Sequence, residues 1–394
     1  MAGARAPVCR SEFQFDAQSL SDLRDRRRGF TLSRDDLGLL NPNTRTCPLF
    51  TSSRDMERIK KIYKRLPILI NESDAKKNKG NPWGIHFWSM FHMSGHSHLF
   101  RTREQLADNG AVLDPDRQFT LNGDRWLRLY ESKLMHNLNH RYNTFEGTKL
   151  LQRRGIKPGT LPVDPAGRRD PGFTVEPRYW VSEEEVTKTV RRAGWDRRWF
   201  PALRSITNVS TNRRSVVASI LPWCAVGNSA TLVHTGPSAE TAALLMACFS
   251  SFAFDYVTRT KLGGPNLNFF ILKQLPAPPP AAFEQLFRGE TVKRFIVPRV
   301  LELIFTARDL APFARDLGFQ GPPFAWDRER REQLRSELDA LFFLMYGMRR
   351  SELESIFSTF PILKRQEEAS GNEFRTQRLT LKAYDLMVDD WPHT

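Results

Sequence analysis

A run of prolines, LPAPPPAAF at residues 275–283, divides the sequence into two parts of different character. Consecutive prolines favour an extended and semi-rigid chain, because each ring fixes φ and removes a backbone hydrogen-bond donor. After this run, a helix is predicted over residues 327–348, with an apolar face made of Leu334, Leu338, Leu341, Phe342 and Met345. Ser351 and Glu354 then have the capping-box spacing that predicts the start of another helix.

The chain before the prolines mixes strand, loop and helix patterns. Residues 54–65 predict an amphipathic helix with a basic exposed side. The β-branched and apolar segments 215–222 and 231–236 predict strands, and residues 242–257 predict an apolar helix. Residues 83–142 interleave aromatic, histidine and basic side chains without a sustained period, which predicts strands and long loops.

These patterns predict an α+β fold, in which a mixed strand-and-loop region is followed by a helical C-terminal module. Three segments are expected: a remnant or edge of an upstream domain at 1–40, the strand-and-loop region at 41–280, and the helical module at 281–394. Residues 152–177 are rich in glycine, proline and arginine, and we interpret them as an exposed insertion or connector.

The charge of the chain is strongly one-sided. Its 59 lysines and arginines outnumber its 44 acidic residues by 15, and its isoelectric point is near 9.9. Such a charge attracts polyanions, so nucleic acid, an anionic membrane and an acidic protein are the partner classes to consider. No segment approaches the about 20 consecutive apolar residues of a transmembrane helix, and the N-terminus lacks a secretory apolar core. We therefore expect a cytoplasmic protein without a membrane partner.

The candidate binding residues are basic and amide side chains. Arginine and lysine contact phosphates or guanine, whereas an asparagine amide presents the donor and acceptor pair that matches adenine. For each residue, a solvated surface position or a loop cap is the alternative interpretation. The DNA interpretation requires the cations to gather on one concave wall of the folded chain. The predicted DNA contacts are Arg45, Arg141, Arg204, Arg213, Arg214, Lys261 and Lys273, with Asn208, Asn212, Asn266 and Asn268.

Catalytic motifs are weak. The sequence has no G-x-G-x-x-G and no G-x-x-x-x-G-K-[ST] pattern. Asp116 and the later Glu131 and Lys133 match the loose Pro-Asp … Glu-x-Lys pattern of Mg²⁺-dependent nucleases, in which two carboxylates hold the metal. A surface turn and an ordinary charged pair explain the same residues. His136 and His140 have the i,i+4 spacing of a helical metal site, but no carboxylate lies between them, and no metal site is assigned.

Several strings of this sequence resemble, in this order, the C-terminal half of large bacterial adenine-specific DNA methyltransferases. These are the type IIG-related enzymes of restriction-modification and phage-defence systems. The likeness covers most of residues 11–394 and is specific as a series. The strings are NPNTRTCPLFTSSRDMERIKKIYKRLPILI (41–70), LRLYESKLMHNLNHRYNTFEG (127–147), PRYWVSEEEV (177–186), LRSITNVSTNRRSVVASILPWCAVGNSATLV (203–233), GGPNLNFFILKQLPAPPP (263–280) and FRTQRLTLKAYDLM (374–387).

The resemblance implies that residues 41–280 recognise a DNA target. In the family, an upstream Rossmann-like domain binds S-adenosylmethionine and carries the Asn-Pro-Pro-Tyr motif, and neither feature appears in this sequence. Residues 11–17, SEFQFDA, look like a last strand of that domain. The resemblance therefore suggests a truncated gene, a split enzyme or a C-terminal subunit. Asn139 departs from the family, whose members usually have an aspartate at this place.

The main hypothesis is the sequence-specific DNA recognition part of an adenine-N6 DNA methyltransferase, inactive by itself. Double-stranded DNA and an N-terminal methyltransferase domain or subunit are the predicted partners. No cofactor is expected in this chain, and S-adenosylmethionine is the cofactor of the intact enzyme. Two alternatives stay open: a Mg²⁺-dependent nuclease using Asp116, Glu131 and Lys133, and a structural subunit whose basic surface binds an acidic protein.

Overall fold

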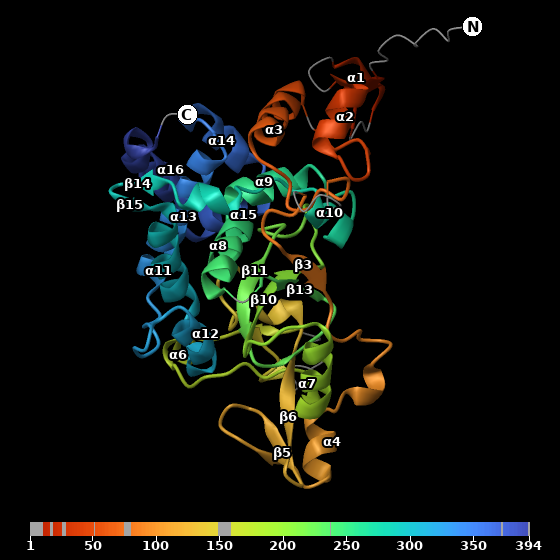
Figure 1. The fold of residues 1–394 in the computed structure, drawn as a ribbon, viewed down its shortest axis with the longest axis vertical. Helices are drawn as coiled ribbons and strands as arrows, with labels where there is room; N and C mark the ends of the chain where they lie inside the picture. Colours follow the sequence, from red (N-terminus) through yellow and green to blue (C-terminus); the bar gives the residue numbers. More distant parts are fainter. Residues whose placement is uncertain are drawn as a thin grey trace, which may run out of the picture.

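The fold is α+β with a helical C-terminal region, as the sequence predicts. Figure 1 shows an elongated molecule with the C-terminal helices towards one end. At the other end lie strands β5 (Phe119–Leu121) and β6 (Asp124–Tyr130) with helices α4 (Arg103–Asp108) and α7 (Glu183–Arg192). The structure is a computed structural model, and it describes residues 11–15, 19–25, 29–50, 52–74, 80–148, 159–236, 238–371 and 373–392.

An antiparallel sheet occupies the middle of the molecule. It contains β11 (Ala218–Pro222), β10 (Trp199–Arg204), β13 (Ala230–His234) and β3 (His86–Trp88), in that order. Strand β11 is buried at every residue, and β10 and β13 are buried except at their last residues. Strands covered on both faces read as continuous apolar runs. The strands predicted over 215–222 and 231–236 are confirmed, although β11 begins only at Ala218.

Strand β6 organises a second sheet. It pairs with β5 and β9 (Trp180–Ser182) in antiparallel fashion and with β12 (Ala225–Val226) in parallel, while β4 (Val112–Leu113) extends the sheet beyond β5. Asn122 and Gly123 connect β5 to β6 with φ values of 51° and 90°. Two left-handed residues form the tight hairpin turn that the Asn-Gly pair favours. Leu106, Phe119 and Trp180 form a small separate core at this end.

Short elements complete the chain up to residue 236. They are β1 (Ser11–Phe13), β2 (Phe30–Leu32), β7 (Asn143–Thr144), β8 (Leu161–Pro162), α1 (Leu20–Arg24), α2 (Arg34–Leu40), α3 (Ser53–Arg65), α6 (Pro165–Arg169), η2 (Ser97–Leu99) and η3 (Ser132–Leu134). Helix α3 confirms the helix predicted over 54–65. Part of the predicted insertion at 152–177 lies outside the described residues. The described remainder is partly internal, because Val163 and Val175 are buried.

Helices dominate the rest of the chain. They are α8 (Ala239–Ser250), α9 (Phe252–Arg259), α10 (Phe269–Lys273), α11 (Val292–Ile304), α12 (Ala311–Asp316), α13 (Arg328–Met345), α14 (Arg350–Ser358), α15 (Pro361–Gly371) and α16 (Arg375–Met387), with the hairpin β14 (Leu286–Phe287) and β15 (Glu290–Thr291), and η4 (Pro280–Phe283), η5 (Arg308–Leu310) and η6 (Val388–Asp390).

Two helix predictions need correction. The helix predicted over 242–257 is interrupted at Ser251, whose extended backbone ends α8 and whose hydroxyl accepts a hydrogen bond from Phe254 N at 3.2 Å to begin α9. Helix α14 begins at Arg350, before the predicted cap: Glu352 Oε2 accepts from the Arg349 backbone N at 2.9 Å, and Ser351 and Glu354 do not form a capping box. In the described part of the chain no single helix is long and apolar enough to cross a membrane. The bent pair α8 and α9, at 59°, meets that criterion of length and composition only when both are taken together.

The proline run packs against the body of the protein. Ala277 N donates to Pro67 O at 3.0 Å, and Trp83 Nε1 donates to Pro278 O at 3.2 Å. One hydrophobic core includes residues from Phe30 to Trp391, so it crosses the expected boundaries at residues 40 and 280. The C-terminal helices and the central sheet are thereby held together by shared packing.

Candidate nucleic-acid interface

Two of the predicted DNA contacts are interior arginines. Arg214 is buried, and it donates to the Asp255 carboxylate and to Ser250 O, each at 2.7 Å. A buried guanidinium that already has acceptors cannot reach a phosphate without losing them. The guanidinium of the fully buried Arg141 likewise donates to the carbonyl oxygens of Gly167, Arg168, Asp170, Phe173 and Thr306. The predictions for Arg141 and Arg214 are therefore wrong.

Lys261 also has a structural role in place of the predicted one. Its Nζ donates to Leu40 O and to Asn41 Oδ1, both at 2.6 Å, and it lies over the Tyr63 ring. Burial holds the pKa of Lys261 well below its usual value. The lysine fixes the segment that follows α2 to the end of α9. It is not available to DNA.

The four predicted asparagines lie on two loops that pair with each other. One loop, residues 205–212, follows β10, and the other, residues 263–268, precedes α10. Thr207 N donates to Pro265 O at 2.8 Å, and Leu267 N donates to Ser205 O at 2.7 Å. We call these paired loops the amide ribbon. Because backbone atoms make these bonds, the pairing does not depend on the asparagine side chains.

The amide ribbon presents amide and apolar groups to solvent. Asn208, Asn266 and Asn268 are exposed and Asn212 is half-buried. The side chains of Asn266 and Asn268 make no hydrogen bond to any described residue. Ile206, which is 55% exposed, lies among them. Exposed amides beside an apolar side chain are the groups that read base edges and thymine methyls.

Arg45 and Lys273 lie at the α10 end of the ribbon. Thr44 N donates to Gln274 Oε1 at 3.2 Å, which places the neighbouring Arg45 close to the end of α10. Arg45 is exposed, and it has no ion pair within the described chain. Lys273 pairs with Glu72 at 2.7 Å, with 32% and 54% of the two side chains exposed. Exposed pairs contribute little, so Lys273 can exchange this carboxylate for a phosphate.

Arg213 lies at the other end of the ribbon. Its side chain is 41% exposed, and its ion pair with Glu367 is long, at 3.7 Å. The half-buried Arg204 donates to Met135 O at 2.8 Å, and Arg335 of α13 donates to Asn137 O at 3.0 Å. The two arginines therefore contact one turn, residues 135–139, from two different elements.

The His136 ring in this turn lies against the Tyr142 ring, with centroids 4.6 Å apart and planes tilted by 35°. We call the half-buried side chains of His136, Tyr142, Arg204, Arg213 and Arg335 the His136 surface. The pKa of His136 is held well below its usual value by burial and then by the charges of Arg204, Arg335, Arg214 and Arg213. The imidazole is thus neutral within a strongly positive environment.

The sequence did not indicate Arg335. It lies in the stretch RERREQLRSE, where arginine and glutamate alternate as on a solvated helix face. The neighbouring Arg331 is instead buried and donates to Leu138 O at 3.1 Å and to Leu303 O at 2.6 Å. Only the tertiary placement of the turn 135–139 against α13 distinguishes these two arginines from ordinary surface residues.

The second histidine of the motif has a separate structural role. His140 Nε2 lies 2.9 Å from Asp309 Oδ1, and Arg128 Nη2 lies 3.1 Å from Asp309 Oδ2. His136 and His140 thus do not face a common metal position. Asn139 is buried and its Oδ1 accepts from Arg141 N at 2.9 Å, a contact that an aspartate would also make.

The residues of the nuclease alternative do not assemble into a metal site. Glu131 pairs with Lys133 at 3.0 Å and lies 3.9 Å from Arg178, whereas Asp116 lies on an exposed turn. Across the residues that the structure describes, no group of three or more His, Cys, Asp or Glu side chains is placed to hold a metal ion. The charged pair and the surface turn are the interpretation that fits these positions.

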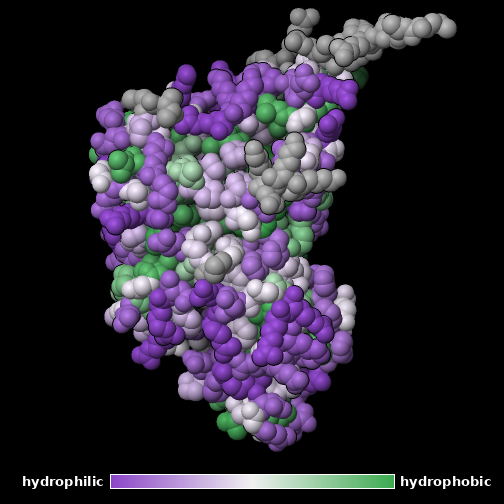
Figure 2. Space-filling model, viewed as in Figure 1, coloured by the Kyte–Doolittle hydropathy of each residue, from purple (hydrophilic) through white to green (hydrophobic). Residues whose placement is uncertain are grey.

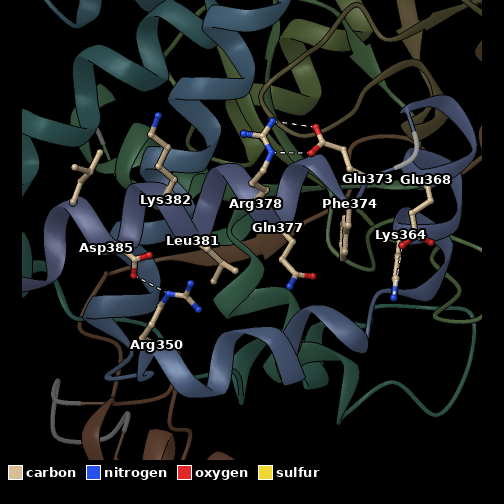
Figure 3. A pocket seen from close by; sticks show the side chains of 11 residues that line it. Arg350, Lys364, Glu368, Glu373, Phe374, Gln377, Arg378, Leu381, Lys382 and Asp385 are labelled. Atoms are coloured by element: carbon tan, nitrogen blue, oxygen red, sulfur yellow. Dashed lines mark hydrogen bonds and ion pairs between the residues drawn. The ribbon is translucent and has the colours of Figure 1, made fainter.

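A groove of about 740 Å³ lies between α14, α15 and α16 (Figure 3). Phe374, Gln377 and Leu381 point into it from one side of α16. Its charged walls combine both signs: Arg350 pairs with Asp385 at 2.7 Å, Lys364 with Glu368 at 3.7 Å, and Arg378 with Glu373 at 2.8 Å. Acidic groups beside the cations make this groove unsuited to a polyanion.

The face of the molecule seen in Figure 2 is mainly hydrophilic, with apolar residues in separate patches. Searches of protein-family models and of curated proteins find no match to this chain. The amide ribbon, with Arg45 and Lys273 at one end and the His136 surface at the other, is the part of the described structure where the predicted residues come together.

Proposed function

We propose that this chain is the sequence-reading part of an S-adenosylmethionine-dependent adenine-N6 DNA methyltransferase of a restriction-modification or phage-defence system. It acts in the cytoplasm, on double-stranded DNA, beside an N-terminal methyltransferase domain or subunit that supplies the cofactor site. The amide ribbon carries the proposal. Two exposed, unbonded asparagine amides on a surface flanked by cations match what reading adenine in a groove requires.

The two kinds of contact have separate roles. Arg45, Lys273 and Arg213 supply phosphate contacts at both ends of the ribbon, and these contacts position the duplex without regard to its sequence. The asparagines between them then test base edges. The net charge of +15 favours the encounter with DNA, and the ordered series of methyltransferase-like strings agrees with this division of roles.

Binding to duplex DNA across a salt series tests the phosphate contacts. Fluorescence anisotropy with a 30-base-pair duplex should give a binding constant whose logarithm falls linearly with the logarithm of salt concentration. The joint change Arg45→Ala with Arg213→Ala should reduce that slope by about 1.8, because each lost phosphate contact removes about 0.9. The control changes Arg191 and Arg192 to alanine, since both are exposed and belong to α7, which lies away from α10 (Figure 1). Salt-insensitive binding, or no binding at low salt, contradicts the proposal.

Selection from a random duplex library tests the base readout. The unchanged chain should enrich a defined sequence, and the joint change of Asn208, Asn266 and Asn268 to alanine should abolish that enrichment while nonspecific binding persists. Enrichment of the same sequence by this variant would contradict base reading by the ribbon. Adding S-adenosylmethionine should yield no N6-methyladenine until an N-terminal methyltransferase partner is supplied.

A further inference from the structure

The turn 135–139 is held by arginines that lack carboxylate partners. Arg204, Arg331 and Arg335 donate to its carbonyl oxygens, and within the described chain none of them lies within 4 Å of a carboxylate. Their Nε atoms are buried and make no hydrogen bond. Carbonyl oxygens carry only partial charge, so this part of the protein keeps an excess of full positive charges.

Desolvation makes that excess costly. Burial lowers the pKa of Arg335 to about 10, and it also lowers the pKa of Arg204 and Arg331. Asp255 pairs with Arg214 at 2.7 Å, and Glu367 accepts from Thr376 at 2.6 Å. The charges of Asp339 and Glu332 act on Arg335, but within the described chain neither carboxylate lies within 4 Å of its guanidinium. An anion from outside the chain would therefore find cations that internal carboxylates only partly neutralise.

The half-buried side chains give such an anion a place to bind. Arg204 of β10 and Arg335 of α13 donate to the carbonyl oxygens of Met135 and Asn137, on either side of His136 in the sequence, and the charge of Arg213 also acts on His136. His136 and Tyr142 add two rings in contact, tilted by 35°, whose polar atoms make no hydrogen bond within the described chain. Guanidinium groups converging on one place match the geometry of a phosphate, because each offers a fork of N–H donors.

We propose that the His136 surface is a phosphate-binding site that holds one phosphodiester of a nucleic acid at the Arg213 end of the amide ribbon. The choice of nucleic acid as the source of the phosphate rests on the proposed function. The phosphate chemistry itself rests on the arginines alone. A bound phosphate would compensate the buried charges and fix the duplex relative to Asn208 and Asn212.

His136 reports directly on the site. A nearby anion opposes the field of Arg204, Arg213, Arg214 and Arg335, so phosphate should raise the pKa of His136 by about 1. Histidine-selective labelling and NMR can follow this titration, with a His136→Asn variant to assign the signal among the 8 histidines. Chloride at equal ionic strength is the reference for screening.

Inorganic phosphate is the first probe. We expect saturable shifts of the His136 signal and affinity about tenfold weaker in Arg213→Gln, because a charged hydrogen bond is lost. Arg335→Gln should weaken it similarly and keeps a donor for Asn137 O, which guards against loss of the fold. Arg191→Gln is the matched control on an exposed helix. No shift, or equal affinity in all three variants, overturns the phosphate site.

A 20-base-pair duplex is the second probe and separates this proposal from the proposed function. We expect the duplex to shift the same His136 signal at lower concentration than phosphate does. Salt-dependent duplex binding that leaves His136 unchanged overturns the site and leaves the proposed function intact. A phosphate response without duplex binding at low salt overturns the proposed function and assigns the site to a smaller phosphate compound.

Discussion

Single residues show how the same residue type serves opposite purposes in this chain. Arg141 and Arg213 are both arginines among polar neighbours in sequence, yet the first is fully buried and the second has a 41% exposed side chain. No local pattern distinguishes them, because Arg141 receives its acceptors from residues 167–173 and 306, far along the chain. Asn208, Asn266 and Asn268 lie on loops and are exposed, which agrees with the usual position of such side chains but was not a prediction from the sequence.

Asp339 should make stability depend on pH. It accepts a hydrogen bond from Phe252 N at 2.8 Å, and burial raises its pKa to about 6. The folded state therefore holds this proton more tightly than the unfolded state does, so the stabilising contribution is complete below about pH 4 and is lost as pH rises through 6. Asp339→Asn should remove that loss. From pH 4 to pH 7 the unchanged protein should lose about 2 to 3 kcal/mol of its free energy of unfolding, and the Asp339→Asn variant should not show this loss. Urea unfolding at several pH values measures this, and parallel pH curves would contradict it.

Elements were predictable where local patterns decide them. The apolar stripe of α3 and the single apolar face of α13 gave their positions within a few residues. The break between α8 and α9 was not predictable from apolar spacing, because it depends on the cap at Ser251. The pairing of the two loops in the amide ribbon joins segments more than fifty residues apart, so no periodicity could indicate it.

The β5–β6 hairpin gives an element-scale prediction. Gly123 has φ of +90°, whereas Gly38 lies within α2 at ordinary helical φ, and a Cβ added to either residue would meet no described atom within 4 Å. Gly123→Ala should cost about 1 kcal/mol through backbone strain alone. Gly38→Ala should be stabilising by about 0.8 to 1 kcal/mol, since alanine favours helix. Thermal unfolding of both variants compares them, and equal effects would show that φ is not the cause.

At the scale of the whole molecule, a buried ion cluster joins the second sheet to the C-terminal helices. Arg128 of β6 and His140 both contact Asp309 of η5. Burial would raise the pKa of Asp309, but His140 and Arg128 outweigh it and hold the pKa well below its usual value. The proline run therefore does not separate two independent bodies.

The DNA-reading region was predicted from the family resemblance. The structure then showed that three of the predicted cations, Arg141, Arg214 and Lys261, are held inside the protein and cannot contact DNA.

Asp309→Ala should weaken the whole fold. Its removal leaves the buried Arg128 charge unpaired, which costs about 3 to 5 kcal/mol. Because the pKa of Asp309 is lowered on folding, its contribution is present above about pH 4 and is lost as pH falls through the folded value. Denaturant unfolding at pH 7 and in acid should show this difference shrinking in acid. Glu284→Ala, which breaks an exposed pair with Lys293, is the control and should cost less than about 1 kcal/mol. Equal losses in the two variants would contradict the cluster's role.

The backbone pairing of Thr207 with Pro265 and of Leu267 with Ser205 has a consequence for evolution. Those bonds do not use the side chains of Asn266 and Asn268, so these two positions can be randomised together with little risk to folding, whereas Asn208 Oδ1 also accepts from Ser210 N at 2.8 Å within its loop. Such a scaffold would let new target preferences arise by a few substitutions, and it marks codons 266 and 268 as the place to start when retargeting the protein.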